Sequence, residues 1–132
     1  PKDLWGLEVR PLRTDHGMGG TSHSYLLSLG ERRLAYVPDM LRDTAEVRQA
    51  LENLDLLVLG TSHYYEGIEM WKRSIMDIMA ASELIRTVSP SQAILTHLSH
   101  TIDYADVSAE ISARLAPNIS LAHDGLIVEV QE

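Results

Sequence analysis

The run Leu-Leu-Val-Leu at residues 56–59, closed by Gly60, constrains the fold more than any other segment. A continuous apolar run that ends at a glycine is typical of a strand buried on both faces. A second run of this kind, Ala-Ile-Leu-Thr, lies at residues 93–96. Segments with helical spacing of apolar residues lie between and beside these runs. The sequence therefore predicts a layered α/β fold with helices over one face of the sheet.

Periodicity predicts the other elements. Helices are expected after the N-cap candidates Asp43 and Thr44, over residues 68–87 and from about residue 105 to 115. Strands are expected from residue 7 to Pro11, in a hairpin at 24–29 and 33–37, and at 119–122 and 126–130. Residues 14–22 are rich in glycine and predict a loop.

The composition limits the class of protein. The length of 132 residues allows one domain or part of one, and the net charge of -8 argues against diffuse binding to nucleic acid. No apolar run approaches the roughly 20 residues that span a bilayer, so no membrane partner is expected. Cysteine is absent, which suits a reducing compartment, and we expect a cytoplasmic protein. Any bound metal must therefore use His, Asp or Glu.

Three candidate ligands follow predicted strands. Asp39 comes after the strand at 33–37, His63 after the run at 56–59, and His97 after the run at 93–96. In open α/β sheets, ligands and chemistry gather at the strand ends. Imidazole nitrogens and carboxylate oxygens that converge from such positions suit zinc or manganese. Each histidine alone is weak evidence, because a lone histidine in a loop is more often solvated or hydrogen-bonded.

Four segments together carry a resemblance to a known family. They are Tyr25-Leu26-Leu27 downstream of His16, Ala-Tyr-Val-Pro-Asp at 35–39, Ile-Leu-Thr-His-Leu-Ser-His at 94–100, and Ala-His-Asp-Gly-Leu-Ile-Val at 122–128. In this order they resemble the C-terminal half of the metallo-β-lactamase fold. More narrowly, they are similar to its phosphodiesterase-like branch, which includes phosphoribosyl cyclic phosphodiesterase.

The resemblance implies a fold and an arrangement of the domain. Residues 1–132 would form the C-terminal half of a four-layer αβ/βα metallo-β-lactamase sandwich. The defining signature of the family, His-x-His-x-Asp-His, is absent from the sequence. We therefore expect the N-terminal half, which carries this metal motif, to lie outside these residues.

The resemblance also implies a metal centre. Two divalent ions, zinc or manganese, would be bound by His16 and His97, one each, with Asp39 bridging them and acting in catalysis. His23 is the alternative to His16 as a ligand. The simpler alternatives are a loop residue for His16, a turn former for Asp39 and a capping side chain for His97.

Further residues are implied at the substrate. His63 is a predicted catalytic residue, and together with Lys72 and Arg73 it is expected to contact the substrate phosphate. His100 and Asp124 are expected to orient the ligands through hydrogen bonds. The alternatives are a solvated basic helix turn for Lys72 and Arg73, and a hydrogen-bonding role for His63.

The predicted function is a metal-dependent hydrolase that uses a metal-activated water and takes a phosphodiester as its small-molecule substrate. The alternative is a non-catalytic fragment or degenerate half-domain that pairs with a partner chain. A half-sandwich exposes an apolar sheet face, which the N-terminal half or a second copy is expected to cover. The side chains expected on this face are Leu7, Val9, Leu27, Leu34 and Leu57. The chain alone is expected to bind metal weakly and to have little activity.

Overall fold

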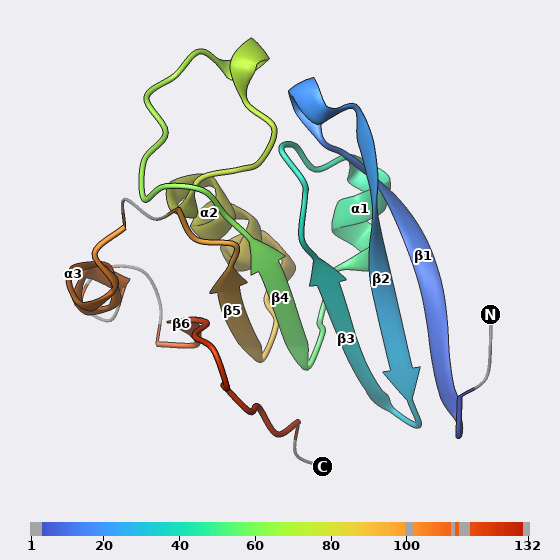
Figure 1. The fold of residues 1–132 in the computed structure, drawn as a ribbon. Helices are drawn as coiled ribbons and strands as arrows, with labels where there is room; N and C mark the ends of the chain where they lie inside the picture. The colour runs from blue at the N-terminus through green and yellow to red at the C-terminus, as the bar shows by residue number, and fades with distance from the viewer. Residues whose placement is uncertain (1–3, 100–101, 112, 114–116, 131–132) are drawn as a thin grey trace.

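The structure is a computed structural model that describes residues 4–99, 102–111, 113 and 117–130. A six-stranded sheet runs through it in the order β1-β2-β3-β4-β5-β6 (Figure 1). The strands are β1 (Leu7–Asp15), β2 (Thr21–Leu29), β3 (Arg32–Val37), β4 (Leu56–Gly60), β5 (Gln92–Thr96) and β6 (Ile119–Leu121). β1, β2 and β3 pair antiparallel, whereas β3, β4, β5 and β6 pair parallel. The two continuous apolar runs form central parallel strands, which confirms that prediction.

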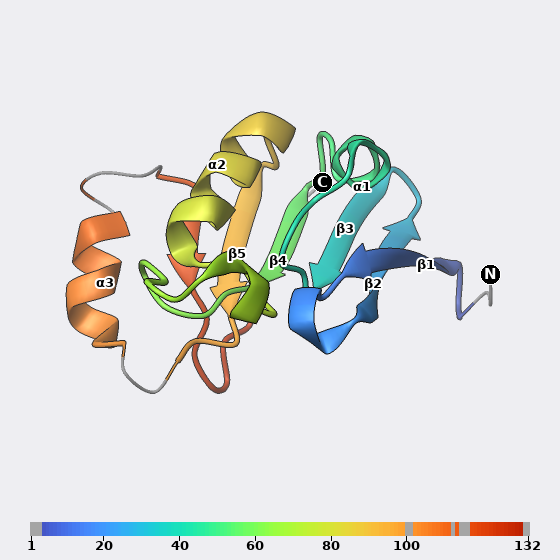
Figure 2. The ribbon, with the colours of Figure 1, turned by 90° about the horizontal axis from the view of Figure 1, so that it is seen from above.

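Two helices cover one face of the sheet, as the sequence predicts. α1 (Ala45–Ala50) and α2 (Ile78–Val88) lie on the same side of it, and α3 (Tyr104–Glu110) lies beyond its β6 edge (Figures 1 and 2). The core fills the space between them, where Leu57, Leu59 and Leu95 of the sheet and Ile78 of α2 are fully buried. No helix in the described part of the chain is long and apolar enough to cross a membrane.

The helix expected over residues 68–87 begins only at Ile78. Asp77 is the N-cap of α2, because its carboxylate accepts the N–H of Ala80 at 2.7 Å, and the helix therefore begins after it. Residues before this cap form a loop that contains the short 3-10 helix η2 (Met70–Lys72). Part of the predicted helix is therefore loop, and this loop lies beside the candidate site.

The strand boundaries differ from the predictions at both ends of the chain. β1 continues through Pro11, because it is an edge strand, where the missing N–H of a proline can face solvent. The strand predicted at residues 126–130 does not form. The last predicted helix forms as α3, which the structure describes as an α-helix to Glu110, with residues 112 and 114–116 outside the described part.

The other face of the sheet carries no helix among the described residues (Figure 2). Most of the side chains predicted on this face lie there and are partly exposed: Leu7, Val9, Leu27 and Leu34. Tyr25 and Tyr36, which pair across β2 and β3, extend it with exposures of 42% and 45%. The prediction for Leu57 is wrong, because its register with Ala35 turns it toward the helices, where it is fully buried.

Candidate metal site

Two predicted ligands meet at the edge where the parallel strands have their carboxyl ends. Asp39 follows β3 and His97 follows β5, and Nδ1 of His97 lies 3.4 Å from Oδ1 of Asp39. Both side chains are accessible, with exposures of 61% for His97 and 34% for Asp39. β4 lies between their strands. A carboxylate and an imidazole thus come together at the sheet edge where ligands bind in open α/β folds.

Gly60, the last residue of β4, permits this arrangement. A Cβ at this position would overlap the backbone carbonyl of Pro38, which precedes the candidate carboxylate. On its other side, the N–H of Thr61 donates to the carbonyl oxygen of Thr96 at 2.8 Å. The ends of β3, β4 and β5 are therefore held close together by backbone atoms, and the absence of a side chain at residue 60 is what makes the approach possible.

His97 has an unusual backbone conformation. Its φ of 59° lies in the left-handed region, which costs a non-glycine residue about 1 kcal/mol. The residues on both sides are fixed, since Thr96 accepts from Thr61 and the N–H of Ser99 donates to the carbonyl oxygen of Ser62 at 3.1 Å. Strained residues held by their surroundings concentrate at functional sites. Here the strained residue is the one whose imidazole contacts the candidate carboxylate.

His16 lies in the loop between β1 and β2, which contains the 3-10 helix η1 (Gly17–Gly19). Its Nδ1 lies 2.6 Å from the carbonyl oxygen of Ser74. Because a carbonyl can only accept, Nδ1 carries the proton and Nε2 keeps a lone pair that could bind a metal. The ring packs against Gly19, where a Cβ would overlap it. The alternative ligand, His23, is exposed within β2, opposite Arg13.

The donors near Asp39 and His97 fit a divalent metal in type and are too few to complete a site. Within the ranges that the structure describes, no group of three or more His, Cys, Asp or Glu side chains is arranged to hold a metal ion. A zinc site takes about four ligands, so these two residues would supply half of one. The other ligands would come from water, substrate or protein outside the described residues.

A hollow of about 260 Å³ lies beside His97. It is lined by residues of the β5 end and of the turn after β6, among them His123 and Asp124. Asp124, predicted to orient a ligand, thus borders the same space as His97. His100, predicted for the same role, lies outside the described residues.

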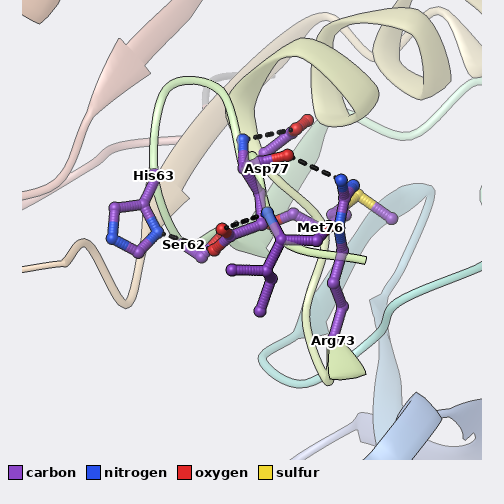
Figure 3. A network of polar contacts seen from close by, with 7 residues as sticks. Ser62, His63, Arg73, Met76 and Asp77 are labelled. Atoms are coloured by element: carbon purple, nitrogen blue, oxygen red, sulfur yellow. Dashed lines mark hydrogen bonds and ion pairs between the residues drawn. The ribbon is translucent and has the colours of Figure 1, made fainter. Parts of the chain in front are cut away.

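His63 faces a carboxylate that the sequence reasoning did not single out. Nδ1 of His63 lies 2.9 Å from Oε2 of Glu66. Glu66 is in turn held by its backbone, since its N–H donates to Oδ2 of Asp77 at 3.0 Å and its carbonyl oxygen accepts from Arg73 at 2.6 Å. Figure 3 shows His63 and Asp77 within this network. The spacing of three residues between His63 and Glu66 is visible in the sequence, but the burial of Nδ1 of His63 against Glu66 is not.

The two basic residues predicted at the substrate differ in their surroundings. Arg73 donates from Nε to the carbonyl oxygen of Ile68 at 2.8 Å and from a terminal nitrogen to Glu66, so it holds the loop together. Lys72 is exposed, with Nζ 3.0 Å from Glu69 and 4.9 Å from the ring centre of Trp71. Only the ammonium of Lys72 is readily available to a ligand.

The sequence of residues 3–98 matches the family model of the beta-lactamase superfamily domain. The chain belongs to this superfamily. The superfamily includes metal-dependent hydrolases, and its proteins typically bind divalent metals such as zinc. The resemblance inferred from the four sequence segments is therefore confirmed at the level of the family. No curated protein matches the sequence.

Several solved structures share the fold of this chain. A diphosphatase of the PhnP family has a TM-score of 0.77 at 22% identity, covering 98% of this chain and 46% of that one. YhfI from Bacillus subtilis has a TM-score of 0.79 at 19% identity, covering 98% and 52%. Zinc-bound PqqB from Methylobacterium extorquens has a TM-score of 0.73 at 17% identity, covering 96% and 51%. The predicted metallo-β-lactamase fold is confirmed, and the chain spans about half the length of these three proteins.

Proposed function

We propose that this chain supplies part of the metal centre of a hydrolase that cleaves phosphodiesters. The observation that carries the proposal is the contact of 3.4 Å between His97 and Asp39 at the carboxyl-end edge of the sheet. It is supported by the strained backbone of His97, because strained residues concentrate at functional sites, and by Gly60, where a Cβ would overlap the carbonyl group before Asp39. The similarity to a PhnP-family diphosphatase supports a substrate that contains phosphate.

Each residue has a separate task in this proposal. Asp39 would bridge two divalent ions, zinc or manganese, with His97 on one and Nε2 of His16 on the other. When bound, such ions lower the pKa of a water molecule toward neutrality and withdraw charge from the phosphoryl oxygen. Lys72 would attract the substrate phosphate, and His63 would accept a proton from the attacking water.

We further propose that the chain acts together with a second layer of protein. The face that carries Tyr25 and Tyr36 leaves these large side chains exposed, and two solved structures of the same fold are about twice as long as this chain. The N-terminal half of the fold is the partner that supplies both a cover for this face and further metal ligands. A second copy of the chain is the alternative cover, and it brings no new type of ligand.

The test is hydrolysis of an aryl phosphodiester with zinc or manganese present. The chain is assayed alone and with a separately expressed N-terminal half that carries His-x-His-x-Asp-His, using Asp39→Asn and the matched control Asp106→Asn, a carboxylate on the exposed side of α3. We expect little turnover by the chain alone, turnover by the combination, and a loss of about 100-fold or more with Asp39→Asn only. Equal activity of the two variants would contradict the proposal, and no turnover in any combination would support the non-catalytic alternative.

A further inference from the structure

The imidazole of His63 has two chemically different edges. Its Nδ1 is buried and has no hydrogen-bond partner among the described residues, yet Oε2 of Glu66 lies 2.9 Å away. The side chain as a whole is 42% exposed, so the accessible edge is the one opposite Nδ1, which carries Nε2. Hydrogen bonds of catalytic groups are often poorly aligned before substrate binds and tighten afterwards. The close approach of this buried nitrogen to the carboxylate of Glu66 therefore points to a functional role for the pair.

Glu66 is fixed in place before any ligand arrives. Its N–H donates to Asp77 at 3.0 Å, its carbonyl oxygen accepts from Arg73 at 2.6 Å, and its Oε1 accepts the N–H of Ile68 at 3.2 Å. Asp77 is itself only 5% exposed, and its other oxygen caps α2. Among the residues that the structure describes, these three hydrogen bonds leave Oε2 as the one polar atom of Glu66 without a hydrogen bond, and it lies 2.9 Å from Nδ1 of His63.

His63 lies next to the segment that bears the candidate metal ligand. The residue before it, Ser62, accepts the N–H of Ser99 at 3.1 Å and donates its own N–H to Met76 at 3.0 Å. Ser99 follows His97 by two residues. Figure 3 shows Ser62 and His63 on the loop that leads away from the sheet, with Met76 and Asp77 opposite. The exposed edge of His63 therefore opens at the same end of the sheet as the candidate metal site.

We propose that Glu66 is a positioning residue that keeps the proton of neutral His63 on Nδ1, so that Nε2 offers a lone pair at the site. The physical reason is that an N–H close to a carboxylate is attracted to it, whereas a nitrogen lone pair close to it is repelled. The assignment of the tautomer rests on the distance of 2.9 Å between Nδ1 of His63 and Oε2 of Glu66 alone. Its catalytic use rests on the proposed function.

In hydrolysis, Nε2 of His63 takes the proton that water loses as its oxygen bonds to phosphorus. The alcohol oxygen whose bond to phosphorus breaks takes a proton from solvent water on the opposite side of phosphorus, and the imidazolium then returns its proton to the hydroxide that remains. Glu66 stabilises the imidazolium between these two transfers, and His63 is neutral again at the end. No oxidant or other reactant is needed.

The decisive comparison is Glu66→Gln against Glu69→Gln. Glutamine at 66 keeps an oxygen for the N–H of Ile68 but places an NH₂ group where Oε2 faces Nδ1. Because the NH₂ group can only donate, the ring should switch its proton to Nε2. Glu69 lies in the same loop, 64% exposed and paired with Lys72, so Glu69→Gln removes the same charge without touching His63.

The readout is the long-range ¹H–¹⁵N correlation spectrum of the histidine rings in the ¹⁵N-labelled chain. It is recorded at a pH high enough for the His63 ring to be neutral. We expect the pattern of the Nδ1–H tautomer for His63 in the wild type and in Glu69→Gln, and the pattern of the Nε2–H tautomer in Glu66→Gln. An Nε2–H tautomer in the wild type, or no change in Glu66→Gln, would overturn the inference. Neither result depends on activity.

A second measurement uses the combination of the two halves. We expect Glu66→Gln to lower kcat by about 10- to 100-fold with KM within twofold, and Glu83→Gln on the exposed side of α2 to change neither. An unchanged kcat in Glu66→Gln would refute the catalytic use of the pair. If the wild type hydrolyses nothing, the proposed function fails, while the spectrum still decides the tautomer.

Discussion

Replacing Gly60 with alanine tests how the fold builds the site. The new Cβ would overlap the carbonyl oxygen and carbon of Pro38, which are backbone atoms and cannot rotate away. The ends of β3 and β4 must therefore separate, at a cost of about 3 kcal/mol, the upper part of the usual range for overpacking. For a domain of this size the cost corresponds to about 10 °C in Tm. Since Asp39 follows Pro38 directly, the same movement should separate its carboxylate from His97.

The matched control is Gly67→Ala, because a Cβ at Gly67 meets no atom within 4 Å and its φ is not positive. This change should alter stability by no more than about 0.5 kcal/mol. Thermal unfolding measures the Tm of each variant, and calorimetric titration with zinc measures the affinity. Gly60→Ala should lower both the Tm and the affinity, whereas Gly67→Ala should lower neither. The account of the strand ends is refuted if the two variants behave alike.

Three other changes test separate parts of the structure. Leu59→Ala removes a side chain that is fully buried beneath the helices and should lower the free energy of unfolding by about 2 to 5 kcal/mol in urea titrations. His97→Gly relieves the left-handed backbone, so the free energy of unfolding should stay equal or rise by about 1 kcal/mol while zinc affinity is lost; lower stability would contradict strain at this residue. The N–H of Arg33, 2.8 Å from Asp55, holds the pKa of the Asp55 carboxyl below its ordinary value of 3.8. This ionised carboxylate stabilises the fold above the unfolded-state pKa, and the stabilisation is lost as the pH falls through the lower folded-state pKa. Asp55→Asn should therefore weaken the acid dependence of unfolding, and an unchanged dependence would count against the assignment.

The central strands and the helix-covered face were predictable because they depend on local pattern. A continuous apolar run needs no distant partner to be recognised as a buried strand, and Thr44 caps α1 by accepting the N–H of Val47 at 3.2 Å, as its residue type suggested. The same runs hide which face a residue occupies. The prediction for Leu57 is wrong because an apolar run without alternation does not indicate which side of the sheet each side chain faces. Only the register of Leu57 with Ala35 shows that it faces the helices.

The loop before α2 shows the limit of helical spacing as evidence. Residues 68–77 continue the apolar pattern of α2, yet Ile68, Met70 and Trp71 are exposed by 48%, 47% and 67%. Hydrogen bonds from Arg73 to loop carbonyls replace those of a helix, and no periodicity reports such bonds. The pairing of His63 with Glu66 lies in this loop and could not be predicted from periodicity either. The positions of Asp39 and His97 could be predicted, because both follow recognisable strands.

The measurement that tests the central claim most directly is paramagnetic broadening by Mn²⁺ in the ¹H–¹⁵N spectrum of the chain. The claim is that Asp39 and His97 together form part of a metal site. We predict that substoichiometric Mn²⁺ broadens first the signals around these two residues, then those around His16, and that Asp39→Asn abolishes this order. Broadening spread evenly over the acidic surface, or centred elsewhere and unchanged by Asp39→Asn, would contradict the claim.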